Sequence, residues 1–397
     1  MTELWIGTYP VAGAGTPVGQ GEGVWSVLLD DETGALTGAR LRTELPAPSF
    51  LALRAPTAPD EVPAPDGTKA PDDVLAPDGT SVPDGTSVPD GTPVPDDVRT
   101  RVYAVLEDEA GRVAGLLPHD GTLAPDAFVP SGGAYPCHLL ATEHALLVAN
   151  YGSGTLGVLA LDETGALRAD QPAVLGHAGH GPREDRQEGP HAHFVALAPG
   201  GRHVLVVDLG TDEVRRYLWD GRTATPDGVA ATLPPGTGPR HLDFSSDGRF
   251  AYVAGELDVA VHVLAWDRDT ATGTLVQSVP AVGGGAAGPA PGQPSHLVVD
   301  SGTVLVAVRG TDVLTAYAVG DDGLLGAGRS ADLGGSWPRH FAVVGRWVVV
   351  ALERAGELVV VDRVLLTAQA DPAGAPGADP VRSRVPLPSP TCVLPHP

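Results

Sequence analysis

Short apolar runs recur along most of the chain, and turn-forming residues separate them. Val, Leu, Phe and Tyr alternate with small or polar residues in these runs, as expected of β-strands, and Pro-Gly-Gly, Ser-Asp-Gly and Gly-Thr-Asp groups fit the turns between strands. No segment keeps a helical period for long. Six segments share the pattern, and each predicts three short strands: 50–53 with 101–108, 137–142 with 146–162, 193–220, 241–267, 295–320 and 340–363.

The segments repeat at the spacing of propeller blades. First-strand histidines are separated by 55, 48, 55 and 44 residues, at His138, His193, His241, His296 and His340. Known blade repeats are about 40–50 residues long. A fourth, less regular strand and a Gly- and Pro-rich return lie between segments, as in LAPDAFVPSGGAYP. We therefore expect four strands per blade.

The two ends of the chain complement each other. The N-terminal ELWIGTYP and GVWSVLLDDETGALTGARL resemble later strands of a blade, whereas the C-terminal SPTCVLP resembles a lone first strand. Joining them gives a seventh blade and removes the exposed edges of an open array. The sequence thus predicts an all-β fold, a single seven-bladed β-propeller domain over residues 1–397, closed by a composite N-/C-terminal blade. The Pro/Asp-rich low-complexity segment 56–98 fits no blade, and we expect it to be a surface insertion between the first two strands of the first blade.

Composition narrows the classes of function. The chain has 49 Asp and Glu against 25 Lys and Arg, a net charge of −24, and such a field repels nucleic acid and anionic membranes. Cys137 and Cys392 are too few for a disulfide framework and have no Cys-x-x-Cys spacing. The N-terminus has no basic stretch before an apolar run, and no window approaches the roughly 18 apolar residues of a membrane span. We expect a cytoplasmic protein, a monomer or weak homo-oligomer, whose partner is a small molecule.

The channel mouth is the expected ligand site, because loops from several blades converge there. The sequences that lead into the first strands place basic side chains at this mouth: His191, His193, Arg240, His241, Arg339 and His340. The ends of the second strands add Asn150, Tyr151, Asp208, Asp212, Glu256 and Arg309. Guanidinium groups bind carboxylate and phosphate oxygens in pairs, so arginines gathered in an acidic chain favour an anion site.

Each of these residues also has a structural interpretation. A histidine that recurs in every repeat is typical of blade scaffolding, which we expect for His138, His241, His296 and His340. The His-Ala-His pair departs from the repeat, which favours a functional role for His191 or His193. The alternative for Arg240, Arg309 and Arg339 is a structural role, in which they bond strand carbonyls across blades. Glu256, if buried, needs a partner such as Arg240.

Metal and cofactor chemistry find little support in the sequence. His191 and His193 alternate on one strand face, but a third ligand would have to come from His177, His180 or Asp208 with no fixed spacing. The chain has no Gly-Lys-Ser/Thr phosphate loop, no Gly-x-Ser-x-Gly elbow and no opening Gly-x-Gly-x-x-Gly helix. We expect no metal and no cofactor.

A set of motifs resembles a known family along almost the whole chain: IGTY (6–9), PSFL (48–51), VANYGSG (148–154), RQEGPHAH (186–193), VVDLGTDEV (206–214), GPRHLDF (238–244), GELD (255–258), VRGTD (308–312) and WPRHF (337–341). Together they look like the lactonase family of seven-bladed propellers, which includes propeller-type 6-phosphogluconolactonases and is related to carboxymuconate-lactonizing enzymes. The resemblance implies hydrolysis of 6-phospho-D-glucono-1,5-lactone in the pentose phosphate pathway, a step of carbohydrate metabolism, without a metal. It implies catalytic roles for His193 or His191, Arg240, Glu256 and Arg309. The family's Asn-Glu and Asn-Arg-Gly are here Gly255-Glu256 and Val308-Arg309-Gly310.

The chemistry of lactone hydrolysis suits these residues. A neutral imidazole of His193 or His191 takes a proton from water, and Arg240 and Arg309 stabilise the tetrahedral oxygen or bind ring hydroxyls. Glu256 would orient Arg240 or the base. We expect Arg339 to hold the phosphate and Asn150, Tyr151 and Asp208 to contact substrate. The alternatives are a lactonase or cyclase for another lactone, such as a muconate-derived one, and a non-catalytic propeller that serves as a binding platform.

Overall fold

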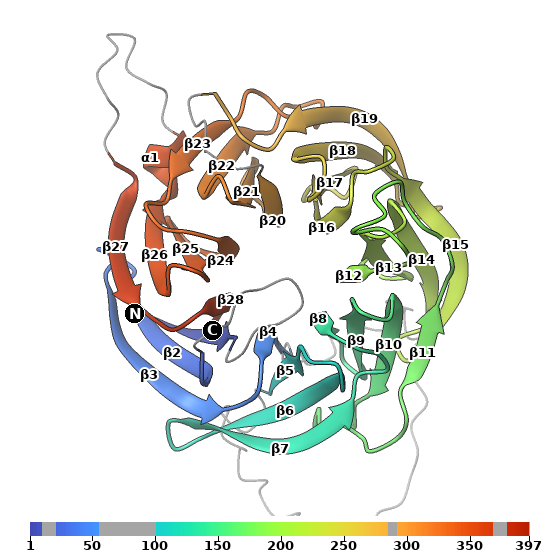
Figure 1. Cartoon of the computed structure of the whole chain (residues 1–397), viewed down its shortest axis with the longest axis horizontal. Coiled ribbons are helices and arrows are strands. Elements are labelled where there is room, and N and C mark those ends of the chain that lie inside the picture. Colours follow the sequence, from blue (N-terminus) through green and yellow to red (C-terminus); the bar gives the residue numbers. More distant parts are fainter. Residues whose placement is uncertain (10–20, 55–100, 285–291, 368–378, 397) are drawn as a thin grey trace, which may run out of the picture.

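The computed structural model describes residues 1–9, 21–54, 101–284, 292–367 and 379–396. Strands in these ranges form seven sheets of four antiparallel strands each, which stand like blades around a central channel (Figure 1). The predicted all-β, seven-bladed propeller is therefore confirmed. The insertion predicted at 56–98 lies outside the described residues.

Each blade runs from an inner strand at the channel to an outer strand at the rim (Figure 1). In that order, blades 1 to 3 consist of β4 (Pro48–Leu53), β5 (Val102–Leu106), β6 (Arg112–His119) and β7 (Thr122–Pro130); β8 (Pro136–Ala141), β9 (Ala145–Asn150), β10 (Thr155–Ala160) and β11 (Ala173–Gly176); and β12 (Ala192–Leu197), β13 (His203–Asp208), β14 (Glu213–Trp219) and β15 (Ala224–Thr232).

Blades 4 to 6 repeat this order. They consist of β16 (Pro239–Phe244), β17 (Phe250–Gly255), β18 (Ala260–Asp267) and β19 (Thr272–Pro280); β20 (Gln293–Asp300), β21 (Thr303–Arg309), β22 (Val313–Ala318) and β23 (Arg329–Asp332); and β24 (Pro338–Val344), β25 (Trp347–Leu352), β26 (Glu357–Asp362) and β27 (Val381–Pro386). A short helix, α1 (Arg363–Thr367), follows β26. No helix in the described ranges has the length and apolar character needed to span a membrane.

Blade 7 joins the two ends of the chain, as predicted. Its strands are β28 (Pro390–Pro395), β1 (Thr2–Thr8), β2 (Gly23–Leu29) and β3 (Leu36–Glu44). In the antiparallel pairing of β1 with β28, Leu4 faces Pro395 and Ile6 faces Val393. This pairing closes the ring, so β1 has no free edge.

The second strand of each blade is buried because neighbouring blades pack against both of its faces. Every residue of β9 and of β13 is buried, and Leu147 and Val206 from these strands belong to one apolar cluster between blades 2 and 3. Such strands are continuous apolar runs, like ALLVAN, instead of alternating ones. Outer strands such as β19 have exposed residues along much of their length. The core therefore consists of the layers between blades.

One extra residue bulges from the inner strand of every blade. The pairing with the second strand skips a residue at the same place in each repeat, at Ser49, Cys137, His193, Arg240, Ser295, Arg339 and Thr391. A bulge bends the strand and redirects a side chain. We call these seven the bulge residues. Four of them line the cavity described below: Cys137, His193, Arg240 and Arg339.

The residues that follow the bulge in blades 1 to 6 form a closed circle of aromatic rings. Successive ring centroids are 3.9–5.3 Å apart around Phe50, His138, Phe194, His241, His296 and His340. Two of the histidines bond the next blade, since Nδ1 of His138 accepts from Val195 N–H at 3.3 Å and Nδ1 of His340 accepts from Val393 N–H at 3.2 Å. The scaffolding role expected for the recurrent histidines agrees with these bonds.

Candidate active site

Each blade also presents a side chain from the end of its second strand. In each blade, one residue of the second strand pairs with the residue that precedes the bulge. The residues that directly follow this paired residue along the chain are Glu107, Tyr151, Leu209, Glu256, Arg309, Glu353 and Tyr9. A recurring backbone bond holds this position: Glu256 N–H donates to the Gly238 carbonyl at 2.9 Å, and Glu353 N–H donates to the Trp337 carbonyl at 3.0 Å. Each blade thus presents two side chains at the same position of the repeat: the bulge residue and the residue at the end of the second strand.

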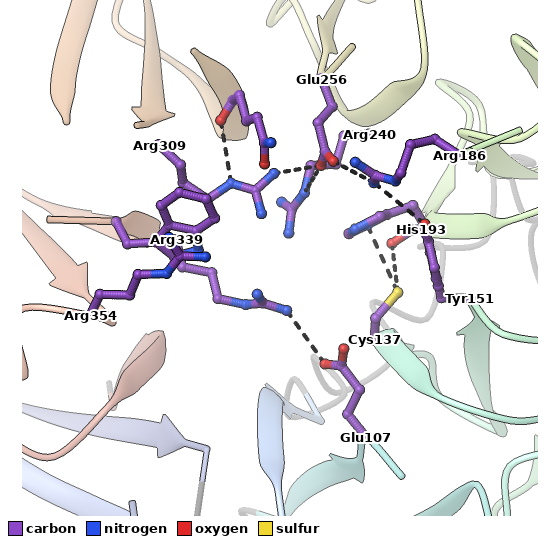
Figure 2. Close-up of a pocket in the computed structure, with 12 residues that line it drawn as sticks. Glu107, Cys137, Tyr151, Arg186, His193, Arg240, Glu256, Arg309, Arg339 and Arg354 are labelled. Carbon is purple, nitrogen blue, oxygen red and sulfur yellow. Dashed lines mark hydrogen bonds and ion pairs between the residues drawn. The ribbon is translucent and has the colours of Figure 1, made fainter. Parts of the chain in front are cut away.

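A cavity of about 410 Å³ lies where these side chains meet (Figure 2). Its volume falls within the usual range for small-molecule sites, roughly 300–1,000 Å³. Blades 1 to 6 and the segment before β12 supply its walls: Glu107, Cys137, Tyr151, Arg186, His193, Arg240, Glu256, Gln293, Arg309, Trp337, Arg339 and Arg354. Five of these are arginines, although the chain as a whole is strongly acidic.

Glu256 is the centre of the first charged cluster. Its Oε1 accepts from Nη2 of Arg186 at 2.7 Å, and its Oε2 accepts from Nη2 of Arg309 at 2.5 Å (Figure 2). Nε of Arg240 lies 3.1 Å from the same Oε2, close enough for an ion pair but without hydrogen-bond geometry. Burial alone would raise the pKa of the Glu256 carboxyl, but the three guanidinium groups outweigh it and hold the pKa far below its usual range. Glu256 is therefore a permanent anion that fixes the arginines.

Arg240 is held from several sides. Its Nη1 donates to the carbonyl of Ser295 and lies 3.1 Å from Nε2 of His241. Burial, followed by the charge of Arg309, lowers the pKa of Arg240 to about 9, so the guanidinium is still charged at neutral pH. Nη2 has no hydrogen bond within the described residues, so it is available to a ligand.

His193 contributes an uncharged imidazole to the same cavity. Burial, followed by the charge of Arg240, holds its pKa well below the ordinary value for histidine, although Glu256 acts in the opposite direction. Nδ1 lies 3.8 Å from Sγ of Cys137 (Figure 2). Nε2 forms no hydrogen bond in the part of the chain that the structure describes. His193 therefore offers a neutral ring nitrogen to a ligand.

Cys137 is not poised as a nucleophile. Burial raises the pKa of its thiol far above the usual value, so the reactive thiolate does not form at neutral pH. Sγ points to the backbone carbonyl of His193 at 3.4 Å. The side chain packs beside the imidazole and helps to fix it.

Arg339 is the centre of a second cluster. Its Nη1 donates to Oε2 of Glu353 at 3.3 Å, and its Nη2 donates to Oη of Tyr9 at 2.8 Å. The same Nη2 lies 3.6 Å from Oε2 of Glu107. Two carboxylates therefore already balance the charge of Arg339.

The fold agrees with comparisons to known proteins. A family model described as "Lactonase, 7-bladed beta-propeller" matches residues 86–395. The chain belongs to this lactonase family. The resemblance seen in the sequence motifs is thereby confirmed.

Several relatives and solved structures are similar to this lactonase-family chain. It is 32% identical over 236 residues to a 6-phosphogluconolactonase of Bacillus subtilis, a match that spans 58% of this chain and 67% of the relative. An uncharacterised protein of Lactococcus lactis is 31% identical over 229 residues, which is 56% of this chain and 65% of that protein. The matches thus span about two thirds of the relatives' length.

Two solved structures share the fold over the whole of this chain. A protein from Lactobacillus plantarum has a TM-score of 0.77 at 24% identity and is covered over 100% of its length. A periplasmic gluconolactonase of Pseudomonas aeruginosa has a TM-score of 0.75 at 24% identity and is covered over 99% of its length. At this level of identity the likeness shows the fold of the lactonase-family chain.

Six of the predicted site residues of this lactonase-family propeller meet at the cavity: Tyr151, His193, Arg240, Glu256, Arg309 and Arg339. Three others support it from outside. His191 stacks on Tyr151 with ring centroids 4.5 Å apart, and its Nδ1 donates to the Tyr151 carbonyl at 3.0 Å. Oδ1 of Asp208 accepts from His191 N–H at 2.9 Å, and Nδ2 of Asn150 donates to the carbonyl of Ser131 at 3.3 Å. None of these three lines the cavity.

The structure corrects the alignment of one repeat. The sequence analysis equates His193 with the recurrent histidines such as His138. The bulge in β12 falls at His193, and Phe194 occupies the place of His138 in the aromatic circle. His193 is therefore the counterpart of Arg240 and Arg339, which explains why it reaches the cavity and His191 does not.

Several residues at or beside the cavity were not predicted from the sequence. Glu107 and Tyr9, together with Glu353 behind Arg339, occupy the same repeat position as Glu256, so alignment of all seven second strands would have found them. Arg186 and Arg354 have no such signal, since they lie in irregular segments. Among the described residues, no group of three or more His, Cys, Asp or Glu side chains is arranged to hold a metal ion.

Proposed function

We propose that this protein hydrolyses a sugar lactone, 6-phospho-D-glucono-1,5-lactone, to 6-phosphogluconate in the pentose phosphate pathway of the cytoplasm. The observation that carries the proposal is a neutral His193 that faces a cavity beside two arginines fixed by Glu256. Family membership and the activity named for the Bacillus subtilis relative support it. A basic cavity also suits an anionic substrate.

His193 would act as the general base. A water between Nε2 and the lactone carbonyl gives its proton to the imidazole as its oxygen attacks C1. The low pKa keeps the ring unprotonated and ready to accept that proton at neutral pH. An anionic substrate in the cavity would offset the nearby arginine charges and raise the pKa of His193, which favours the transfer.

Arg240 and Arg309 would stabilise the tetrahedral oxygen. Both guanidinium groups are held by Glu256, so they are oriented before substrate arrives and need little rearrangement during the reaction. The tetrahedral intermediate then collapses, the C1 bond to the ring oxygen breaks, and the imidazolium of His193 returns its proton to that oxygen. The products are a free hydroxyl and a carboxylic acid, which releases its proton to solvent and becomes a carboxylate, with no net change at the imidazole.

The proposed reaction needs no metal, because the base, the oxyanion donors and the carboxylate that holds them are all side chains. Dialysis against a chelator such as EDTA tests this directly. We expect at least about 80% of the activity to survive treatment that strips a zinc-dependent control hydrolase, as follows from a base that is not a metal-bound water. Loss of activity that zinc or magnesium restores would contradict metal independence.

The two histidines of the His-Ala-His pair provide a matched test. His193→Ala and Arg240→Ala are each expected to lower kcat/KM for 6-phosphogluconolactone at least about tenfold, since a general base and an oxyanion donor each contribute about 10²-fold or more. His191→Ala is expected to change kcat/KM less than about threefold, because His191 is outside the cavity. Circular dichroism checks that each variant is folded.

A panel of lactones completes this test. Turnover of a muconate-derived lactone in preference to the sugar lactone would replace the proposed substrate, and no turnover of any lactone would favour a binding platform. A folded His193→Ala variant with wild-type kcat/KM would remove His193 from the mechanism.

A further inference from the structure

One arginine at the cavity has no carboxylate partner. Glu256 is shared by three arginines, and Arg339 is shared by Glu107 and Glu353. Arg354 lines the same cavity and forms no ion pair within the described residues. The cavity lining holds five arginines and two carboxylates, Glu107 and Glu256, and Glu353 lies behind Arg339, so positive charge is in excess there. A phosphate monoester carries about −1.5 to −2 at neutral pH and would balance that excess.

Arg354 is arranged to offer its donors to such a group. The centre of its guanidinium lies 3.1 Å from the centroid of the Trp337 ring. Stacking uses the flat face of a guanidinium, whereas its N–H donors lie in the plane and point outward. Arg354 is exposed, in contrast to the buried His193 and Arg240. Figure 2 shows Arg354 and His193 on opposite sides of the cavity, so the donors of Arg354 would meet a part of a ligand away from the reacting carbonyl.

The ring under Arg354 is itself fixed. Trp337 has a φ of +69°, a left-handed conformation that bulky residues seldom adopt. Two hydrogen bonds hold it there: Trp337 N–H donates to Oδ1 of Asp312 at 2.8 Å, and its carbonyl accepts from Glu353 N–H at 3.0 Å. The centre of the Arg309 guanidinium lies 5.4 Å from the same ring, so the platform connects the cavity rim to the Glu256 cluster. The same conformation recurs directly before the inner-strand proline of other blades, at Ala47, Tyr135 and Ser389, so the fold itself holds Trp337 in this position.

We propose that Arg354, stacked on Trp337, binds the phosphate of the substrate and selects phosphorylated sugar lactones over unphosphorylated ones. This inference rests on the proposed function, because it takes the substrate to be a lactone with a distal phosphate. It moves the phosphate from Arg339, the site expected from the sequence, to an arginine whose charge is not yet balanced.

The test compares two lactones that differ only in the phosphate. Arg354→Gln is expected to lower kcat/KM for 6-phosphogluconolactone about 10- to 100-fold, mainly through KM, as for loss of a charged hydrogen-bonded pair. Its kcat/KM for unphosphorylated glucono-1,5-lactone should change less than about threefold. Arg249→Gln is the control, since Arg249 is another exposed arginine beside an aromatic ring, 5.7 Å from the Phe250 centroid, and it does not line the cavity.

A binding measurement separates this inference from the proposed activity. Calorimetry with 6-phosphogluconate and with gluconate, at one fixed salt concentration, needs no turnover. We expect wild type and Arg249→Gln to bind 6-phosphogluconate at least about tenfold more tightly than Arg354→Gln does, with no such difference for gluconate. This pattern without lactone hydrolysis would overturn the proposed function and keep the phosphate site. Equal binding of 6-phosphogluconate by wild type and Arg354→Gln, or none by wild type, would overturn the phosphate site.

Discussion

At the scale of single residues, Glu256 determines the chemistry of the cavity. A buried carboxylate loses the hydration that stabilises its charge, and arginine partners must make up for that loss. Here three guanidinium groups surround one carboxylate, and the pKa of Glu256 falls instead of rising. The cluster thereby fixes two arginines, Arg240 and Arg309, in the wall of the cavity.

Removal of this one charge should therefore affect both stability and activity. Glu256→Gln keeps the shape of the side chain but leaves the buried arginines unbalanced, so we expect the free energy of unfolding to fall by about 3 kcal/mol. We also expect kcat/KM to fall at least about tenfold. Urea denaturation and lactone assays measure the two effects.

An exposed ion pair gives the control for this change. Glu357 accepts from Arg384 at 2.7 Å near the surface, and such pairs contribute about 0–1 kcal/mol. Glu357→Gln should therefore leave both stability and kcat/KM nearly unchanged. A Glu256→Gln protein as stable and active as the Glu357→Gln protein would show that the cluster does not hold the arginines.

Site residues could be predicted from the sequence only where they occupy a position of the repeat. Arg240 and Glu256 were found because each stands next to a strand motif that recurs along the chain. Arg186 reaches Glu256 from a segment with no repeat, and its contact depends on how that segment folds. Arg354 stands out only in the structure, because the other arginines at the cavity already form ion pairs with carboxylates.

At the scale of elements, the repeated unit is an inner strand with a bulge beside the end of the second strand. Apolar alternation and turn residues are local properties of the sequence. They were enough to locate the strands and to predict the number of blades. Register is not local, because one extra residue reverses which side chains face the channel. That is why the sequence placed His193 with His138, although the bulge puts it with Arg240.

The closing strand offers a test at this scale. Deletion of residues 390–397 removes β28, unpairs β1 and uncovers Leu4 and Ile6, both fully buried. Each such aliphatic side chain contributes roughly 1.5–3 kcal/mol when buried, and Val393 is lost as well. We expect the melting temperature to fall by about 10 °C or more in calorimetry. Deletion of residue 397 alone is the control, and a truncated protein that melts within about 2 °C of it would contradict closure through β28.

At the scale of the whole molecule, buried histidines from several blades lie around the channel and share one electrostatic property. Burial lowers the pKa of each recurrent histidine, to about 3 for His340, and His193 in the cavity shares this property. Above about pH 6.5 these rings are neutral in both the folded and the unfolded chain. Below it the unfolded chain binds protons that the folded protein does not, so stability falls as the pH falls.

The expected result is a steep loss of stability in mild acid. Each fully titrating histidine lowers the free energy of unfolding by up to about 1.4 kcal/mol per pH unit. Urea denaturation at pH 7.5, 6.5 and 5.5 measures this before most carboxylates titrate. His340→Phe should reduce the slope, since Phe50 and Phe194 show that a phenyl ring fits the circle. A free energy of unfolding that stays constant over this range would contradict a neutral histidine circle.

We propose that the cavity at the channel mouth hydrolyses a phosphorylated sugar lactone, with His193 as the base. The most direct measurement is the rate at which freshly generated 6-phosphogluconolactone disappears with wild-type protein, with His193→Ala and with no protein. We expect a rate with wild type far above the spontaneous one and a rate with His193→Ala reduced at least about tenfold. Folded wild-type protein that leaves the lactone to its spontaneous rate would contradict it.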